Sequence, residues 1–215
     1  NLPLKPAGSQ VHLFNGQLKS DQNVHAAVVD VSVGNKDLQQ CADAVMRLRA
    51  EYLFASKRQD EVAFAFTSGF MAEWKRWRKG ERIKVVGNTC SWKRNAAPDS
   101  SHAQLLIFLE KVFTYAGTLS LQRMLVRGSD PLIGDVFIQG GSPGHAVIVV
   151  DKATHANGRI AVLLAQSYMP AQEIHVLKNL HRPELGAWFI LDDGTELMTP
   201  QWTFAWVDRS RWQNE

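Results

Sequence analysis

The feature that most constrains the fold is a run of short strand-like segments in the last third of the chain. Each segment is rich in β-branched or other apolar residues, and glycine, proline or asparagine separates it from the next, which is typical of strands joined by turns. The segments are 135–139, 145–151, 159–166, 173–177 and 188–191. Because short turns join strands that run in opposite directions, residues 131–215 are expected to form mainly an antiparallel sheet.

The preceding residues, 21–130, show mainly helical periodicity. Helices are expected at about 37–54, 69–79, 102–115 and 120–126, with short strands at 25–33, 62–66 and 82–86 and a polar loop at 87–101. Residues 1–20 contain prolines and glycines and predict an extended lead-in. Helices early and a meander late predict an α+β fold with N-terminal helices packed on a C-terminal antiparallel sheet, and 215 residues suit a single domain.

Composition excludes some classes of protein. No apolar run approaches the roughly 20 residues that cross a bilayer, so no transmembrane segment is expected. A net charge of +3 and two cysteines give no reason to expect a nucleic-acid partner or a disulfide scaffold. No cofactor is expected, and the oligomeric state is open. The chain begins at Asn1, and since a cleaved leader leaves no trace, export stays open as well.

The most site-like segment is 134–166, centred on His145. Segments 135–139 and 145–151 predict a hairpin whose loop contains Gly140, Gly141 and Gly144, residues that permit close backbone approach and a cleft beside the loop. A symmetric hairpin around 152–159 places Gln166 directly opposite His145, where its amide orients the imidazole. A slip of one residue would place Ser167 or Ala165 there instead.

Cys41 is the candidate nucleophile for this histidine. With Asp37 as the N-cap, Cys41 is the fourth residue of a helix whose positive end favours a thiolate. Gln40 offers an amide to an oxyanion, together with the loop glycines Gly141 and Gly144. Cys41 also lies on the apolar stripe of that helix, so a buried core cysteine is the alternative. No disulfide to Cys90 is expected, because Cys90 lies in a polar loop.

Two other kinds of site compete with the hydrolase. Trp74, Trp77 and Arg78 lie in a basic stretch and suggest a non-catalytic module that binds glycan or an anionic polymer, although buried tryptophans on an amphipathic helix are the simpler interpretation. Asp135, His145 and His175 have the right side chains for a metal, but no metal-ligand spacing is present and no metal site is expected.

The pieces around these residues resemble papain-like hydrolases, especially the CHAP and NlpC-type cell-wall amidases and endopeptidases. They are Cys41 on its helix, GDVFIQ at 134–139, GHAVIVVD at 144–151 and Gln166. This resemblance implies a papain-like core, a cysteine peptidase or amidase activity and a peptide or cell-wall fragment as substrate. In that family the cysteine usually lies in the first helical turn, whereas here it follows a capped turn.

The whole chain resembles an uncharacterised family of exported bacterial proteins. The matching stretches are LQQCADAVMRLRAEYL, IGDVFIQGGSPGHAVIVVD and LLAQSYMPAQEIHVL. This second resemblance implies a setting in the bacterial envelope, in the periplasm or at the cell surface, and carries no activity with it.

Overall fold

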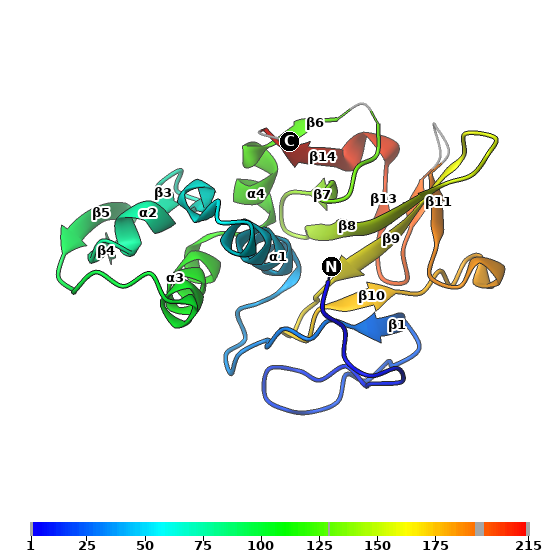
Figure 1. The fold of residues 1–215 in the computed structure, drawn as a ribbon, viewed down its shortest axis with the longest axis horizontal. Helices are drawn as coiled ribbons and strands as arrows, with labels where there is room; N and C mark the ends of the chain where they lie inside the picture. The colour runs from blue at the N-terminus through cyan, green and yellow to red at the C-terminus, as the bar shows by residue number, and fades with distance from the viewer. Residues whose placement is uncertain (1, 129, 192–195, 214–215) are drawn as a thin grey trace.

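The main sheet of the protein is antiparallel and forms the right-hand half of the molecule in Figure 1. The computed structural model describes residues 2–128, 130–191 and 196–213. The strand order in the sheet is β1-β10-β9-β8-β7-β14-β6, with β11 paired to the other part of β9. The bounds are β1 His25–Val28, β6 Leu125–Arg127, β7 Val136–Gln139, β8 His145–Thr154, β9 Ile160–Gln166, β10 His175–Leu177, β11 Phe189–Leu191 and β14 Arg209–Trp212.

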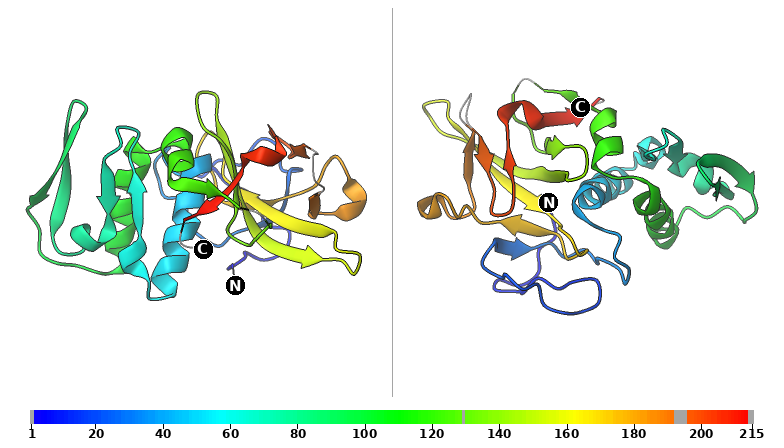
Figure 2. Two further views of the ribbon diagram at one scale, coloured as in Figure 1. Left: turned by 90° about the horizontal axis from the view of Figure 1, so that it is seen from above. Right: turned by 180° about the vertical axis from the view of Figure 1, so that it is seen from behind.

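Helices and two small hairpins make up the other half of the molecule. The helices are α1 Cys41–Ala55, α2 Trp74–Trp77, α3 His102–Tyr115 and α4 Thr118–Met124, and the small paired strands are β2 Ala63–Ala65 with β3 Met71–Glu73 and β4 Glu81–Val86 with β5 Thr89–Arg94. Both views in Figure 2 place α1 between the sheet and the outer elements α2, α3, β4 and β5. The predicted α+β fold is confirmed, with helices on one side of an antiparallel sheet.

Strand alternation gives the sheet two different faces. Ile138, Ala146 and Ile148 pack with α1 in the larger core, which the helices complete. Their neighbours along the same strands, Phe137 and Val147, point to a second core on the opposite face. The strand pair β12 Leu197–Met198 and β13 Thr203–Phe204 covers this second face and contributes Leu197 and Phe204 to it. The sheet is therefore buried on both sides at β7, β8 and β9.

Several local predictions differ from the structure. The last two residues of the predicted helix 120–126 belong to strand β6. The predicted helix 37–54 begins four residues later, at Cys41. The predicted basic helix 69–79 is only Trp74–Trp77, because Met71–Glu73 pairs with β2 as a strand. Residues 89–94 were predicted as loop and instead form β5, which pairs along its whole length with β4. In each case a pairing partner or a cap elsewhere in the chain outweighed the local pattern.

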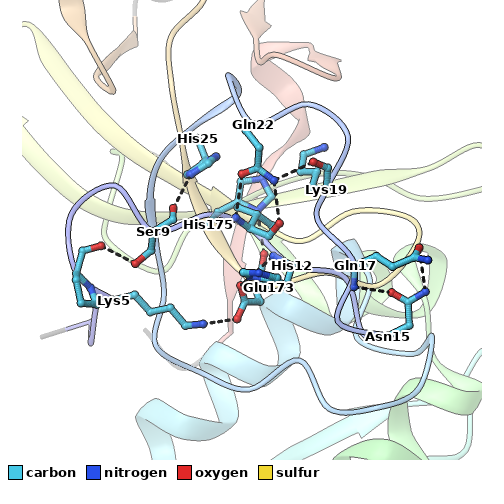
Figure 3. Close-up of polar contacts among 12 residues, drawn as sticks. Lys5, Ser9, His12, Asn15, Gln17, Lys19, Gln22, His25, Glu173 and His175 are labelled. Carbon is cyan, nitrogen blue, oxygen red and sulfur yellow. Dashed lines mark hydrogen bonds and ion pairs between the residues drawn. The ribbon is translucent and has the colours of Figure 1, made fainter.

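Residues 2–20, which precede the first strand, contact the sheet through charged and polar side chains (Figure 3). Glu173, just before β10, accepts hydrogen bonds from Lys5 Nζ and from the backbone N–H of His12 at 3.0 Å. The imidazole of His25 bonds the backbone oxygen of Ser9 at 3.0 Å. Bridges from Leu4 to Val29 and from Leu13 to Gln172 add backbone contacts. Residues 2–20 therefore lie against β10 and β1.

The helices in the described ranges are all too short or too polar to cross a membrane.

Candidate cysteine–histidine site

His145 is the first residue of β8, and the hairpin that precedes it has the predicted form. β7 and β8 pair antiparallel with Gln139 opposite His145. The loop between them contains the cis peptide bond Ser142–Pro143. The His145 side chain is buried, with 1% of the residue exposed. The imidazole therefore lies at the mouth of a strand, under cover of other side chains.

Gln166 contacts His145, as predicted, although the two residues are not direct partners. The Nε2 of His145 and the Oε1 of Gln166 are 2.8 Å apart. The predicted direct pairing is wrong, because the hairpin turns later than expected and pairs Thr154 with Ile160. A bulge between Val149 and Asp151 moves the register back by one residue, so that Ile148 pairs with Ala165. Gln166 is thus a diagonal neighbour on the same face, still within reach of a long side chain.

Aromatic rings enclose the imidazole. The ring of Phe204 stacks on it with centroids 5.9 Å apart, Trp202 lies at 5.5 Å, and Tyr168 meets it edge-on at 5.1 Å. Burial lowers the pKa of His145 to about 4, and the hydrogen bond with Gln166 opposes this shift only in part. The imidazole is neutral at pH 7. Since a carbonyl oxygen only accepts, the proton sits on Nε2.

Nδ1 is therefore the unprotonated nitrogen of His145. Among the residues that the structure describes, no side chain or backbone group hydrogen-bonds to it. A neutral histidine held through one nitrogen, with the other nitrogen unoccupied, is the arrangement that a general base requires.

Cys41 is the first residue of α1, which corrects the predicted helix start. The N-cap is Gln40, and its backbone N–H donates to the carboxylate of Asp43 at 3.1 Å in a capping box. Asp37 instead accepts hydrogen bonds from the side chain of Gln40 and from the N–H of Ala171. The cysteine thus lies in the first helical turn.

The thiol of Cys41 is partly exposed and has backbone amides around it. The N–H groups of Ala42, Ala146 and Cys41 itself interact favourably with the sulfur. Burial nevertheless dominates and raises the pKa of Cys41 to about 11, with a smaller contribution from the carboxylate of Asp43. The predicted lowering of this pKa is wrong, because desolvation outweighs the helix N-terminus. Cys41 and Cys90 are both free thiols, as predicted.

Ala146 connects the two candidate catalytic residues. Its backbone N–H is near enough to the sulfur of Cys41 to favour the thiolate slightly, and it directly follows His145 in β8. In the described part of the chain, thiol and imidazole form no hydrogen bond with each other. Catalytic hydrogen bonds of this kind are often long before substrate binds and tighten in the reacting complex. The start of α1 therefore lies beside the start of β8 at Ala146. The imidazole of His145, one residue earlier in β8, stacks on Phe204 in the second core.

The glycine loop 140–144 packs against α4. The N–H of Gly140 donates to Gln122 at 3.1 Å, and the N–H of Gly141 donates to Thr118 at 3.3 Å. A Cβ on Gly144 would lie 2.6 Å from the hydroxyl of Thr118 and 2.7 Å from the backbone oxygen of Gly141. The glycines make room for neighbouring protein atoms, so Gly141 and Gly144 support the hairpin.

The two tryptophans of the predicted binding module are buried. Trp74 is fully buried, Trp77 is buried against α3, and Arg78 forms an ion pair with Asp60. The indoles are core residues and are not available to stack on a sugar.

Asp135, one of the three candidate metal ligands, lies away from His145. Asp135 pairs with Arg209 and Arg211, and it lies four residues before the partner of His145 in β7, roughly 13 Å away along the strand. In the described ranges no group of three histidine, cysteine or acidic side chains is arranged to hold a metal ion.

A cavity of about 450 Å³ lies elsewhere, between α1, β2 and α4. Leu53, Ala65 and Met124 are among its lining residues, whereas Cys41 and His145 are not. His145 and Gln166 are buried, and it is their side-chain chemistry, not a cavity, that marks them as the candidate site.

Three residues that the sequence did not bring to attention complete the site. Gln201 accepts a hydrogen bond from Gln166, Trp202 covers His145, and Asp43 is buried beside Cys41. Gln201 and Trp202 follow β12 in the C-terminal region, and no spacing links them to 145–166. The available signal for Asp43 was its position three residues after Gln40, which is the spacing of a capping box.

These features define a mixed α+β protein with a cysteine at a helix start and an amide-held histidine at a strand start. The chain belongs to the family described as "Domain of unknown function (4846)", whose model matches residues 1–211. No curated protein and no solved structure matches it.

Proposed function

We propose that the protein is a cysteine hydrolase that cleaves a peptide or amide bond. Cys41 is the nucleophile, His145 the general base and Gln166 the residue that orients His145. The observation that carries this proposal is the hydrogen bond of 2.8 Å between His145 Nε2 and Gln166 Oε1, which leaves Nδ1 unprotonated. His145 directly precedes Ala146, whose N–H favours the thiolate of Cys41.

The resting pair is a neutral thiol and a neutral imidazole. With the pKa of Cys41 raised to about 11 and that of His145 lowered to about 4, a thiolate–imidazolium pair is not populated before substrate binds. The proton therefore leaves the sulfur as the sulfur attacks, and His145 acts as a general base in the same step.

The reaction follows in two stages. The sulfur of Cys41 bonds to the carbonyl carbon while Nδ1 of His145 takes the thiol proton, and the carbonyl oxygen becomes an oxyanion. The C–N bond then breaks, the leaving amine takes the proton from Nδ1, and an acyl thioester remains on Cys41. Water attacks the thioester, gives its proton to Nδ1 and releases the acid, and the proton returns to the sulfur.

Main-chain amides at the start of α1 stabilise the oxyanion. The N–H groups of Cys41 and Ala42 already face the sulfur, and they sit at the positive end of a helix of 15 residues. The side chain of Gln40 donates to Asp37 at 3.0 Å, so it supports the turn before the helix.

The substrate and the setting follow from the resemblance to CHAP and NlpC-type enzymes. A peptide of the bacterial cell wall is the proposed substrate, and the periplasm or cell surface is the proposed location. Tyr168 and Trp202 flank His145 and offer flat apolar surfaces to a peptide group, which supports an uncharged section of peptide at the reacting bond.

The experiment is to trap the acyl thioester. The protein is mixed with cell-wall peptide fragments and with a panel of peptide amides, quenched in acid and analysed by intact mass and peptide mapping. An acyl adduct on Cys41 is expected in the native protein and in Cys90→Ala, and it disappears in Cys41→Ala and in His145→Ala. An adduct on Cys90, or hydrolysis that survives Cys41→Ala, contradicts the proposal.

The second candidate, a binding module for an anionic polymer, has one observation in its favour. Lys84 and Lys93 are exposed on the β4–β5 hairpin and form no ion pair within the described residues. Retention on a polyanion column that is lost in Lys84→Ala/Lys93→Ala, together with no hydrolysis in any form of the protein, would favour this function.

A further inference from the structure

We propose that Gln201 is a positioning residue that sets the tautomer of His145 through Gln166. This inference rests on the proposed function for its catalytic meaning. The two successive hydrogen bonds, from Gln201 to Gln166 and from Gln166 to His145, can be tested without any assumption about activity.

The two hydrogen bonds use opposite ends of one amide. The Nε2 of Gln166 donates to the Oε1 of Gln201 at 2.5 Å, and the Oε1 of Gln166 is 2.8 Å from Nε2 of His145. An amide has one accepting end and one donating end. Because Gln201 presents an acceptor, Gln166 turns its donating end away from the imidazole and its accepting end toward it. His145 must then carry its proton on Nε2.

The opposite orientation would remove the base. If the amide of Gln166 turned over, its N–H would donate to Nε2 of His145, and the proton would move to Nδ1. His145 would then have no lone pair for the thiol proton. Gln166 is buried, with 1% of the residue exposed, so water does not readily replace Gln201 as its acceptor.

The turn that carries Gln201 is rigid, which makes it a suitable anchor. Thr199 fastens the turn with three bonds: its hydroxyl donates to the backbone oxygen of Trp202 at 2.7 Å, its N–H donates to the same oxygen at 2.8 Å, and the N–H of Trp202 donates to its hydroxyl at 3.1 Å. Thr199 is buried, with 3% exposed.

A second chain of hydrogen bonds holds the next residue of the same turn. The indole N–H of Trp202 donates to Oε1 of Gln139 at 2.9 Å, and Nε2 of Gln139 donates to Asp208 at 2.7 Å. A carboxylate at the end of this chain fixes the amide of Gln139, which fixes Trp202 over the imidazole. Consecutive residues, Gln201 and Trp202, thus hold His145 from two directions.

The test measures the tautomer directly. ¹⁵N-histidine-labelled protein is studied by two-bond ¹H–¹⁵N correlation at pH 7, where the two neutral tautomers give different nitrogen shifts. Native protein should show Nε2–H at His145. Gln201→Met, which has no acceptor, should show a mixture of both tautomers. Gln201→Glu, which only accepts, should keep Nε2–H. Thr203→Val, an exposed change in the same hairpin, is the matched control and should behave as the native protein.

Acylation of Cys41 is measured on the same proteins. Substitutions of groups that orient a reacting histidine cost roughly ten-fold or more, so Gln201→Met should slow acylation by about that factor and Gln201→Glu should restore most of it. An unchanged tautomer in Gln201→Met overturns the inference, even where acylation by Cys41 is found. A changed tautomer without any acylation supports Gln201 as the positioning residue and contradicts the hydrolase.

A folding failure does not leave the question open. If Gln201→Met does not fold, Gln201→Glu decides by itself. Its carboxylate is linked to His145 through two successive hydrogen bonds, so it should raise the pKa of the imidazole while the proton stays on Nε2. A titration identical to the native protein would overturn the inference.

Discussion

His145 and Gln166 are joined by a hydrogen bond of 2.8 Å although the β8–β9 ladder pairs Ile148 with Ala165 and so does not set them opposite each other. Their contact depends on the length of the glutamine side chain. A shorter side chain at 166 leaves the imidazole without its acceptor.

Gln166→Ala should therefore slow acylation of Cys41 by roughly 10- to 100-fold, as expected for loss of a residue that orients a reacting imidazole. Burst kinetics with an activated ester give the acylation rate. Gln59→Ala removes a glutamine side chain that makes no hydrogen bond in the described structure and serves as the control. Equal rates for the two variants would show that Gln166 does not act on His145.

The thiol of Cys41 should titrate near pH 11, because burial raises its pKa to about 11. The thiolate absorbance at 240 nm, followed in a Cys90→Ala background, measures this directly. Asp43→Asn should lower the midpoint, because the carboxylate of Asp43 contributes to the rise. A midpoint below 8 in the parent protein would show that the thiolate is already favoured at rest, and that the neutral resting pair is wrong.

Asp43→Asn should also stabilise the protein at alkaline pH. Burial raises the pKa of Asp43 to about 8 in the folded protein, against about 3.9 in an unfolded chain. Between about pH 4 and pH 8 the unfolded state binds fewer protons than the folded state, so the free energy of unfolding falls as the pH rises through this range. The contribution of Asp43 to stability is complete below about pH 4. At about 1.4 kcal/mol per pKa unit, the variant should gain roughly 2 to 5 kcal/mol over the native protein between pH 4 and pH 8.

Urea unfolding of both proteins at pH 4.5 and pH 8.5 checks this expectation. The asparagine still accepts the N–H of Gln40, so the cap is retained. Parallel stability curves for the two proteins across this range would show that the folded-state pKa of Asp43 is ordinary.

Gly144→Ala should destabilise the β7–β8 hairpin. The added Cβ would lie 2.6 Å from the Thr118 hydroxyl and 2.7 and 2.8 Å from the backbone oxygens of Gly141 and Gln139. Two of these atoms belong to the backbone and cannot move away easily, so we expect the free energy of unfolding to fall by about 1 to 3 kcal/mol. Thermal unfolding against Ser142→Ala, an exposed position in the same loop, measures it. Equal unfolding temperatures would mean that the loop shifts freely.

Much of the candidate site could be predicted locally. The alternation of 135–139 and 145–151 and the glycines between them predict a hairpin, and the structure pairs Gln139 with His145. A symmetric hairpin predicts Gln166 opposite His145, whereas the β8–β9 hairpin turns later, pairing Thr154 with Ile160, and has a bulge near Val149. The error did not change the face, because the register moved by an even number of residues at the site, and side chains alternate with period two.

The sequence by itself determined the α+β class, the hairpin that presents His145, the face on which Gln166 lies and the helix that carries Cys41. Hydrophobic periodicity and turn-forming residues act over a few residues, so they can be recognised from the sequence alone. Only the tertiary structure decided the start of that helix, the pKa of its thiol, the packing of the glycine loop on α4 and the approach of Gln201 and Trp202. Desolvation and long-range hydrogen bonds depend on which distant segments contact each other, and no local sequence pattern specifies these tertiary contacts.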